Sequence, residues 1–254
     1  MSGRLSVVGL GPGAAAQLTS AAQAALVAAS DLFGYAPYLA RLTPRPGQSM
    51  HPSDNREELQ RARAAIELAA GGRHVAMVSG GDPGVFAMAA AVCEAIDRGP
   101  AAWRRLDLEI LPGITAMLAV AARCGAPLGH DFCALSLSDN LKPWETVEAR
   151  LRAAAAAGFV LALYNPVSRA RPWQLGRAFD VLRDTLPPET AVVFGRSADR
   201  PDERIVVASL GEADPGIADM ATCVIVGSAA TRVVARGDLP PLVYTPRFAE
   251  GAAG

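Results

Sequence analysis

The hydrophobic positions in the first half of the chain form short runs that alternate with amphipathic, alanine-rich segments. The runs near residues 4–9, 75–79 and 106–111 are short, rich in Val, Leu and Ile, and followed by glycine or proline, which predicts buried strands. Strands that alternate with helices indicate a mainly parallel sheet. The expected helices lie at about residues 20–29, 56–70, 85–96 and 115–124.

Three of these strands end in glycine-bearing corners: Gly9-Leu10-Gly11-Pro12-Gly13, Ser79-Gly80-Gly81-Asp82-Pro83 and Pro112-Gly113-Ile114-Thr115. The carboxyl ends of parallel strands lie along one edge of a sheet, so three such corners favour a shared ligand crevice. Glycine allows the backbone there to approach a ligand closely. Asp82 and Pro83 also have the chemistry of a helix N-cap and a first helical residue, which predicts that a helix begins at this point.

The first corner does not fit a dinucleotide-binding fold. That fold needs G-x-G-x-x-G, whereas Pro12 and Gly13 follow Gly11 immediately. The acidic residue expected at the end of the second strand is also missing, because Asp31 precedes the run at residues 32–35.

Strands with few intervening helices characterise the second half, which predicts a mixed sheet. The fold class is therefore α/β with two α/β domains. We expect an N-terminal domain at 1–112, a C-terminal domain at 113–246 and a flexible tail at 247–254. The expected strands of the second half lie at about residues 132–137, 159–164, 190–195, 204–209, 222–226 and 242–244.

Composition narrows the function by exclusion. The net charge of −1 does not favour a nucleic-acid or membrane partner, and no apolar stretch approaches the roughly 20 residues of a membrane-spanning helix. The four cysteines form no C-x-x-C pair and have no histidine at ligand spacing, so we expect reduced thiols, a cytoplasmic location and no metal. The N-terminus shows no signal-peptide pattern, and the chain has no nucleophile elbow, Walker A string or H-E-x-x-H.

The three corners and the strand at 222–227 stand in the same order as in the tetrapyrrole methylases, and the chain resembles this family over essentially its whole length. The segments 136–144, 163–166 and 169–172 resemble the members that act on precorrin-3B. The resemblance implies two α/β domains, an S-adenosylmethionine site in the cleft between them, and a homodimer. It also implies methylation of precorrin-3B at C-17, with extrusion of a ring carbon as an acetyl group, to give precorrin-4 and S-adenosylhomocysteine.

The resemblance further implies a set of site residues. The expected cofactor contacts are Leu10, Gly80, Gly81, Asp82, Val85, Phe86, Ile114, Thr115, Leu163, Tyr164, Ala221 and Thr222. The expected substrate contacts are Gly11, Pro12, Gly13, Tyr35, Tyr38, Asn140, Arg169, Arg171 and Arg196.

Two groups of candidate residues also have a chemical rationale. Asp139, Ser136 and Tyr164 are hypotheses for the proton transfers of ring contraction, although Asp139 and Asn140 are equally residues that form turns. Precorrins carry acetate and propionate groups, which arginines bind well. Arg169, Arg171 and Arg196 follow strand ends, but with so many arginines in the chain they are equally explained as solvated loop residues.

Other functions stay open from the sequence alone. The nearest are the cobalt-dependent counterpart of the anaerobic pathway and a precorrin methylase acting at another ring position. A methylase of the same superfamily that modifies ribosomal RNA or protein is disfavoured, because the chain lacks the positive charge that nucleic acid would favour. A non-catalytic carrier of S-adenosylmethionine or of a tetrapyrrole is an alternative of a different class.

Overall fold

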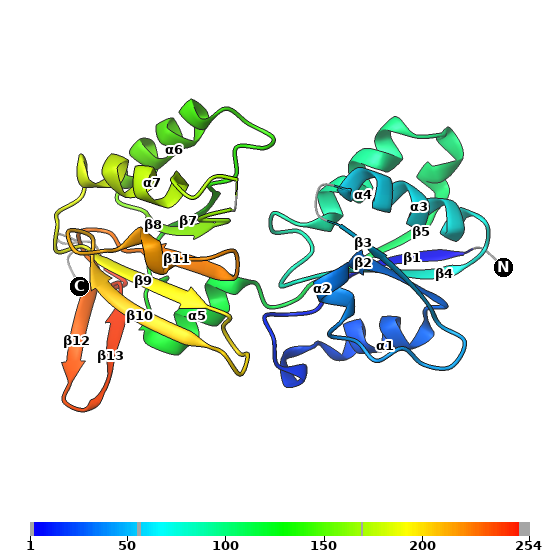
Figure 1. Ribbon diagram of the computed structural model, residues 1–254, viewed down its shortest axis with the longest axis horizontal. Helices are drawn as coiled ribbons and strands as arrows, with labels where there is room; N and C mark the ends of the chain where they lie inside the picture. The colour runs from blue at the N-terminus through cyan, green and yellow to red at the C-terminus, as the bar shows by residue number, and fades with distance from the viewer. Residues whose placement is uncertain (1–2, 55–56, 169, 249–254) are drawn as a thin grey trace. The chain divides into compact units, whose positions relative to one another are not determined.

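The computed structural model describes residues 3–54, 57–168 and 170–248, and the chain divides into two compact units (Figure 1). Unit 1 is Met1–Thr115 and unit 2 is Ala116–Gly254. The sequence-based boundary lay three residues earlier, after residue 112. Most of the expected tail, residues 249–254, lies outside the described residues.

Unit 1 contains one five-stranded sheet with helices on both faces (Figure 1). Its strands are β1 (Arg4–Gly9), β2 (Asp31–Tyr35), β3 (Ser49–Ser53), β4 (His74–Ser79) and β5 (Asp107–Leu111). Its helices are the short η1 (Ala15–Gln17), α1 (Ser20–Ala28), α2 (Ala36–Leu39), α3 (Glu58–Ala70), α4 (Met88–Arg98) and the short η2 (Ala101–Arg105).

All the strand pairs of this sheet are parallel, in the order β3-β2-β4-β1-β5, which confirms the expected parallel sheet. Successive residues of a strand point to opposite faces. Val7 accordingly packs with the buried residues of α3 and α4, and Val8 packs with those of α1 and α2. Gly9 pairs with Ser79 and Val8 with Leu111, so the three corners begin at nearly the same level of the sheet.

The proline-rich segment between α2 and α3 contains the edge strand β3, where Pro52 is tolerated because an edge strand needs fewer hydrogen-bond donors. The N-cap of α1 is Thr19, whose Oγ1 accepts a hydrogen bond from the Ala22 N–H at 3.1 Å.

Unit 2 contains a five-stranded sheet and a smaller three-stranded one. Its strands are β6 (Gly125–Ala126), β7 (Phe132–Ser136), β8 (Val160–Tyr164), β9 (Ala191–Arg196), β10 (Arg204–Ser209), β11 (Thr222–Val226), β12 (Arg232–Arg236) and β13 (Leu239–Tyr244). Its helices are α5 (Ala116–Cys124), α6 (Trp144–Ala156), α7 (Gln174–Arg183) and the short η3 (Pro215–Ile217).

The larger sheet has the order β10-β9-β11-β8-β7, and only β7 and β8 are parallel neighbours, which confirms the expected mixed sheet. Helices α6 and α7 cover one face around the buried Leu151 and Phe179. Helix α5 packs on the other face so closely that a Cβ added to Gly195 would lie 2.1 Å from Val120 Cγ2.

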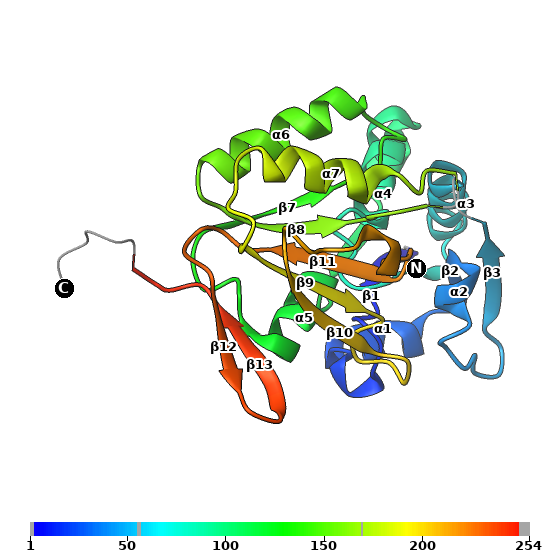
Figure 2. The ribbon, with the colours of Figure 1, turned by 60° about the vertical axis from the view of Figure 1, so that its left-hand side comes forward.

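Strands β12 and β13 form a ribbon that extends beyond the larger sheet of unit 2 (Figure 2). Only the segment 242–244 was expected to be a strand, because Pro240 and Pro241 obscure the rest of the pattern. In the described part of the chain, no helix is long and apolar enough to cross a membrane.

Candidate functional site

The corners that follow β1 and β4 are joined to each other by backbone hydrogen bonds. The Gly11 N–H donates to the Gly81 carbonyl at 3.1 Å, and the Gly81 N–H donates back to the Gly11 carbonyl at 3.0 Å. The Leu10 N–H also donates to the Ser79 carbonyl, at 2.9 Å. These bonds hold two of the predicted ligand-binding corners together.

The corner after β5 packs directly against both of them. A Cβ added to Gly113 would lie 2.4 Å from the Gly81 carbonyl oxygen, and one added to Gly9 would lie 2.7 Å from the Gly113 nitrogen. Glycine is therefore required here because one backbone contacts another, with no space for a side chain. The expectation that the three corners meet is confirmed.

Asp82 links the second corner to the third. One carboxylate oxygen accepts the Gly84 N–H at 2.7 Å, and the other accepts the Gly113 N–H at 3.0 Å. The expectation that Asp82 caps a helix was wrong, because α4 begins only at Met88, after an N-cap at Ala87. The intervening Phe86 has φ of +52°, which is incompatible with a continuous helix through residues 83–88.

Aromatic and basic side chains from the end of β2 and the segment after it lie near these corners. A Cβ added to Gly80 would lie 2.7 Å from the Tyr38 ring, and Tyr35 contacts Tyr38 edge to face with ring centroids 5.5 Å apart. The Arg41 guanidinium donates to the Leu10 and Gly11 carbonyls at 3.0 and 3.2 Å. No motif singles out Arg41, because arginine is common in this chain.

The remaining unit 1 candidates lie in the three corners or just after the second one. They are Pro12, Gly13, Val85, Phe86, Ile114 and Thr115, and Thr115 is buried.

Unit 2 gathers several predicted residues at the carboxyl ends of the parallel strands β7 and β8. The buried Ser136 hydroxyl accepts a hydrogen bond from Asn165 Nδ2 at 2.9 Å. Asp139 Oδ1 accepts a hydrogen bond from Gln174 Nε2 at 2.9 Å and forms an ion pair with Arg171 Nη1, also at 2.9 Å. Ser136 and Asp139, two of the three candidate proton carriers, therefore each have side-chain partners that hold them in place.

The loop after β7 contacts the predicted Arg171 and also contains Lys142, which the sequence motifs did not assign to the site. Arg171 also donates to Asn140 Oδ1 at 2.5 Å, so Arg171 contacts both predicted loop residues. Lys142, the only lysine of the chain, donates to the Ser138 carbonyl at 2.9 Å. Burial, together with the charge of Arg150, lowers the pKa of Lys142, and Asp139 opposes the shift.

Gln174 and Asn165 were also missed. Gln174 is buried at the start of α7, and its amide nitrogen donates to the Leu137 carbonyl as well as to Asp139. Asn165 has φ of +52°, a conformation that asparagine tolerates better than most residues. The only available signal was its place directly after a strand, in the Asn165-Pro166 pair.

The other unit 2 candidates lie on β8, β9 and β11, and Ala221 directly precedes β11. The Tyr164 hydroxyl accepts a hydrogen bond from the Met117 N–H in the first turn of α5, at 3.0 Å. Leu163 is buried, and Thr222 pairs with Arg196 on the neighbouring strand β9. Arg169 lies outside the described residues.

Arg196 is a weaker candidate for a substrate contact than the sequence suggested. Its guanidinium bonds to Asp219 at 2.7 Å and to Asp202 at 2.6 Å. Hydrogen bonds to these two carboxylates raise the pKa of Arg196. A side chain already held between two carboxylates is poorly suited to bind a further anion.

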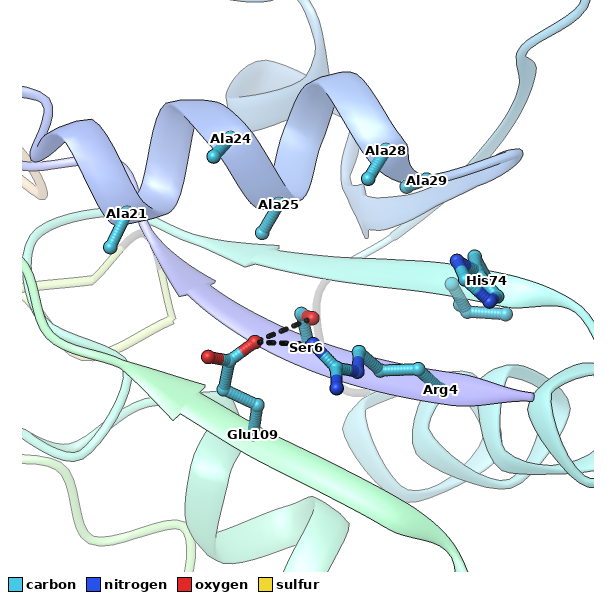
Figure 3. A pocket seen from close by; sticks show the side chains of 10 residues that line it. Arg4, Ser6, Ala21, Ala24, Ala25, Ala28, Ala29, His74 and Glu109 are labelled. Carbon is cyan, nitrogen blue, oxygen red and sulfur yellow. Dashed lines mark hydrogen bonds and ion pairs between the residues drawn. The ribbon is translucent and has the colours of Figure 1, made fainter. Parts of the chain in front are cut away.

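Figure 3 shows a pocket of about 400 Å³ in unit 1. The alanines of α1 face Ser6 and Glu109, whose side chains are 3.3 Å apart, and Arg4 also contacts Glu109. Arg4 and His74 begin their strands, so this pocket lies toward the amino ends of β1 and β4. The corners lie at the opposite ends, and we assign no part of the site to this pocket.

Comparison with known proteins defines the class. The family model of the tetrapyrrole (corrin/porphyrin) methylases matches residues 4–214. The chain belongs to this family.

Individual relatives narrow the comparison. The chain is 66% identical over 253 residues to a protein from Sinorhizobium sp. named precorrin-3B C(17)-methyltransferase, with 100% of both chains covered. It is 52% identical to the crystal structure of the methyltransferase CobJ, with a TM-score of 0.92, covering 96% of this chain and 100% of that one.

A more distant solved structure contains a cofactor product. It is uroporphyrin-III C-methyl transferase from Thermus thermophilus complexed with S-adenyl homocysteine, 25% identical with a TM-score of 0.67. The match covers 89% of this chain and 98% of that one.

Proposed function

We propose that this chain is an S-adenosylmethionine-dependent C-methyltransferase that methylates precorrin-3B at C-17 and contracts the ring, giving precorrin-4 and S-adenosylhomocysteine. The observation that carries the proposal is the full-length similarity to the Sinorhizobium protein of that name. The ordered corners and the polar loop after β7 are the parts of the chain that would perform the chemistry.

The residues of the site fit the cofactor. The corners of unit 1 offer backbone groups and the Asp82 carboxylate, and a carboxylate suits a cofactor with a sulfonium and an ammonium group. Each Asp82 oxygen accepts one hydrogen bond in the structure and has capacity for another. S-adenosylmethionine would supply an electrophilic methyl group. The residues proposed to hold it are Leu10, Gly80, Gly81, Asp82, Val85, Phe86, Ile114 and Thr115 in unit 1, and Leu163, Tyr164, Ala221 and Thr222 in unit 2.

Methyl transfer to an electron-rich ring carbon requires orientation more than acid–base help. A donor and an acceptor held in line at roughly 3 Å gain most of the acceleration available from proximity. Corners fixed by backbone bonds, such as the reciprocal pair between Gly11 and Gly81, supply the rigidity that such alignment needs. Exclusion of water protects the reactive methyl group.

Ring contraction also requires a proton to be moved, and the loop after β7 offers groups for this. Asp139 is oriented by Gln174 and Arg171, and Ser136 is oriented by Asn165. A general acid or base must be held within hydrogen-bond reach of its target, which is what such partners achieve. We propose Asp139 as the main proton carrier, with Ser136 and Tyr164 as further candidates.

The substrate carboxylates need cationic partners, and Arg171 is the candidate that the structure favours. Its side chain is 27% exposed and lies beside Asn140, so one edge is accessible. We propose that acetate or propionate groups bind there, with Tyr35, Tyr38 and the segment 11–13 contributing the apolar and backbone contacts. We also propose a homodimer, which light scattering of the purified protein would test.

The test is turnover of precorrin-3B with S-adenosylmethionine, followed by mass and optical analysis of the product. The proposal predicts a methylated, ring-contracted product and one equivalent of S-adenosylhomocysteine. A methylated but uncontracted ring would contradict the ring contraction alone. Cofactor binding without S-adenosylhomocysteine formation would indicate a carrier, and turnover restricted to the cobalt-containing substrate would indicate the cobalt-dependent counterpart.

A further inference from the structure

We propose that Asp219 is a positioning residue that shapes the Ala221–Thr222 segment for cofactor binding, and that Arg196 fixes Asp219 in place. The inference rests on the proposed function, which assigns Ala221 and Thr222 to the cofactor site. Neither the sequence motifs nor the family resemblance drew attention to Asp219.

The Asp219 side chain closes a small ring of hydrogen bonds around this segment. Its Oδ1 accepts the Ala221 N–H and the Thr222 hydroxyl, each at 2.9 Å. The Thr222 Oγ1 in turn accepts the Asp219 N–H at 3.0 Å, and the Thr222 N–H donates to the Asp219 carbonyl at 3.1 Å. The turn that begins β11 therefore depends on one carboxylate and one hydroxyl.

Arg196 anchors this turn to the neighbouring strand. Its Nε donates to Asp219 Oδ2 at 2.7 Å, and its backbone pairs with Thr222 across β9 and β11. The Ser197 N–H donates to the Ala221 carbonyl at 3.0 Å. The segment is thus fixed through a side chain and through the backbone.

The charge state of Asp219 suits this role. Burial alone would raise the pKa of Asp219, but hydrogen bonds from Arg196, Thr222 and the Ala221 N–H outweigh it and lower the pKa. Asp219 is therefore ionised at neutral pH, when a carboxylate is a stronger acceptor than a neutral group. The two Asp219 oxygens already accept from these three donors. Asp219 therefore acts through the Ala221–Thr222 segment and not by direct contact with the cofactor.

The position of the segment connects it to the proposed site. Val224 pairs with Leu163 in the antiparallel pair of β11 and β8, so Thr222 lies at the end of the sheet where β8 finishes at Tyr164. Thr222 is buried, and a shift of its backbone would alter the wall that Ala221 and Thr222 form.

Asp202 provides a matched control. Its carboxylate also accepts from Arg196, at 2.6 Å, and from the Ser197 hydroxyl at 3.1 Å. Asp202 and Asp219 therefore both pair with Arg196, which ends strand β9. Among the described hydrogen bonds, only the Asp219 carboxylate accepts from Ala221 and Thr222.

The experiment compares S-adenosylhomocysteine binding by calorimetry in the wild type, Asp219→Ala and Asp202→Ala. We expect Asp219→Ala to weaken binding by on the order of tenfold, which is the loss expected for a charged positioning hydrogen bond. We expect Asp202→Ala to change binding less than about threefold, as is usual for an exposed ion pair. In turnover, Asp219→Ala should raise KM for S-adenosylmethionine while leaving kcat at saturation and KM for precorrin-3B near their wild-type values.

A further variant tests the hydroxyl that Asp219 bonds. Thr222→Val removes this hydroxyl and should weaken binding as Asp219→Ala does. If Asp219→Ala does not fold, Asp219→Asn supplies the comparison, because its amide oxygen can still accept from Ala221 while its pairing with Arg196 is lost.

The outcomes distinguish this inference from the function on which it rests. Equal losses in Asp219→Ala and Asp202→Ala, or unchanged binding in Asp219→Ala, would overturn the positioning role alone. A wild-type protein that does not bind S-adenosylhomocysteine would overturn the proposed function and the inference together.

Discussion

The two units build their candidate loops in different ways. In unit 1 the three corners are held mainly by backbone contacts, such as the reciprocal bonds between Gly11 and Gly81 and the approach of Gly113 to Gly81, with the Asp82 carboxylate as an added link. In unit 2 the loops are held by side chains, such as the ion pair of Asp139 with Arg171 and that of Arg196 with Asp219. Backbone contacts fix geometry strictly, whereas polar side chains can also exchange protons and bind anions.

This difference predicts two patterns of sensitivity. Substitutions in the unit 1 corners should act mainly on stability, because a side chain cannot be added without moving the backbone. Substitutions in the unit 2 loops should act mainly on chemistry and binding, because partly exposed ion pairs contribute little to stability.

Gly113→Ala should have the largest effect on stability. The new Cβ would lie 2.4 Å from the Gly81 carbonyl oxygen, and overpacking of this kind costs about 3 kcal/mol. Gly176→Ala is the control, because its Cβ would meet only Pro215 Cγ at 3.6 Å within helix α7. That change should stabilise the protein by about 0.5 kcal/mol or more. Urea unfolding measures both variants, and equal stability would contradict the backbone account of unit 1.

Asp82→Ala should cause the next largest loss of stability. It removes an acceptor from both Gly84 and Gly113, and we expect a loss of about 2 kcal/mol in the free energy of unfolding. Asp214→Ala removes a similar local bond, to the Gly216 N–H at 2.8 Å, but among the described residues the Asp214 carboxylate has no partner in a distant loop. Its cost should be about 1 kcal/mol. Equal stability of Asp82→Ala and Asp214→Ala would show that the hydrogen bond from Gly113 to Asp82 does not stabilise the fold.

Asp139→Asn should change stability by less than about 1 kcal/mol, because its ion pair with Arg171 is partly exposed. Its effect should fall on the chemistry, with ring contraction slowed by about a hundredfold or more, the lower end of the range typical for general acid–base catalysis. Product analysis by mass spectrometry measures the fraction of contracted ring. Full conversion at the wild-type rate would exclude Asp139 as the proton carrier.

The smallest expected effect concerns the rates at which the cysteine thiols react. These rates report whether the core of unit 2 is closed to the reagent. Burial raises the pKa of Cys124 to about 11 and that of Cys223 to about 12, and it also raises the pKa of Cys133. Cys93 is exposed on α4. At pH 8 a thiol reagent should therefore label Cys93 first and reach the others only slowly or on unfolding. Four rapidly reacting thiols in the native protein would show that the core of unit 2 is open.

The sequence predicted best where one pattern determines one structure. Short apolar runs such as 75–79, each followed by a glycine corner, predicted the parallel sheet and the meeting of the three corners. Prediction from the sequence failed where the same local chemistry fits two structures. Asp82 followed by Pro83 has the composition of a helix start, yet the carboxylate bonds Gly84 and the distant Gly113, and the helix begins later at Met88.

The partners of the predicted site residues were the hardest to find. Asp139 and Asn140 could be selected from the sequence, but their contacts with Arg171 and Gln174 join residues more than thirty positions apart. Asp219 had no motif at all, because its role depends on a turn and on the register of β9 with β11. Such long-range pairings are visible only in the folded chain.

The most direct test of the central claim follows a ¹³C-labelled methyl group from S-adenosylmethionine into the product of cobalt-free precorrin-3B. Our account predicts one labelled methyl group at C-17 by NMR, together with an acetyl signal from the extruded ring carbon. A label at another ring position, or a methylated macrocycle that keeps all its bridging carbons, would contradict it.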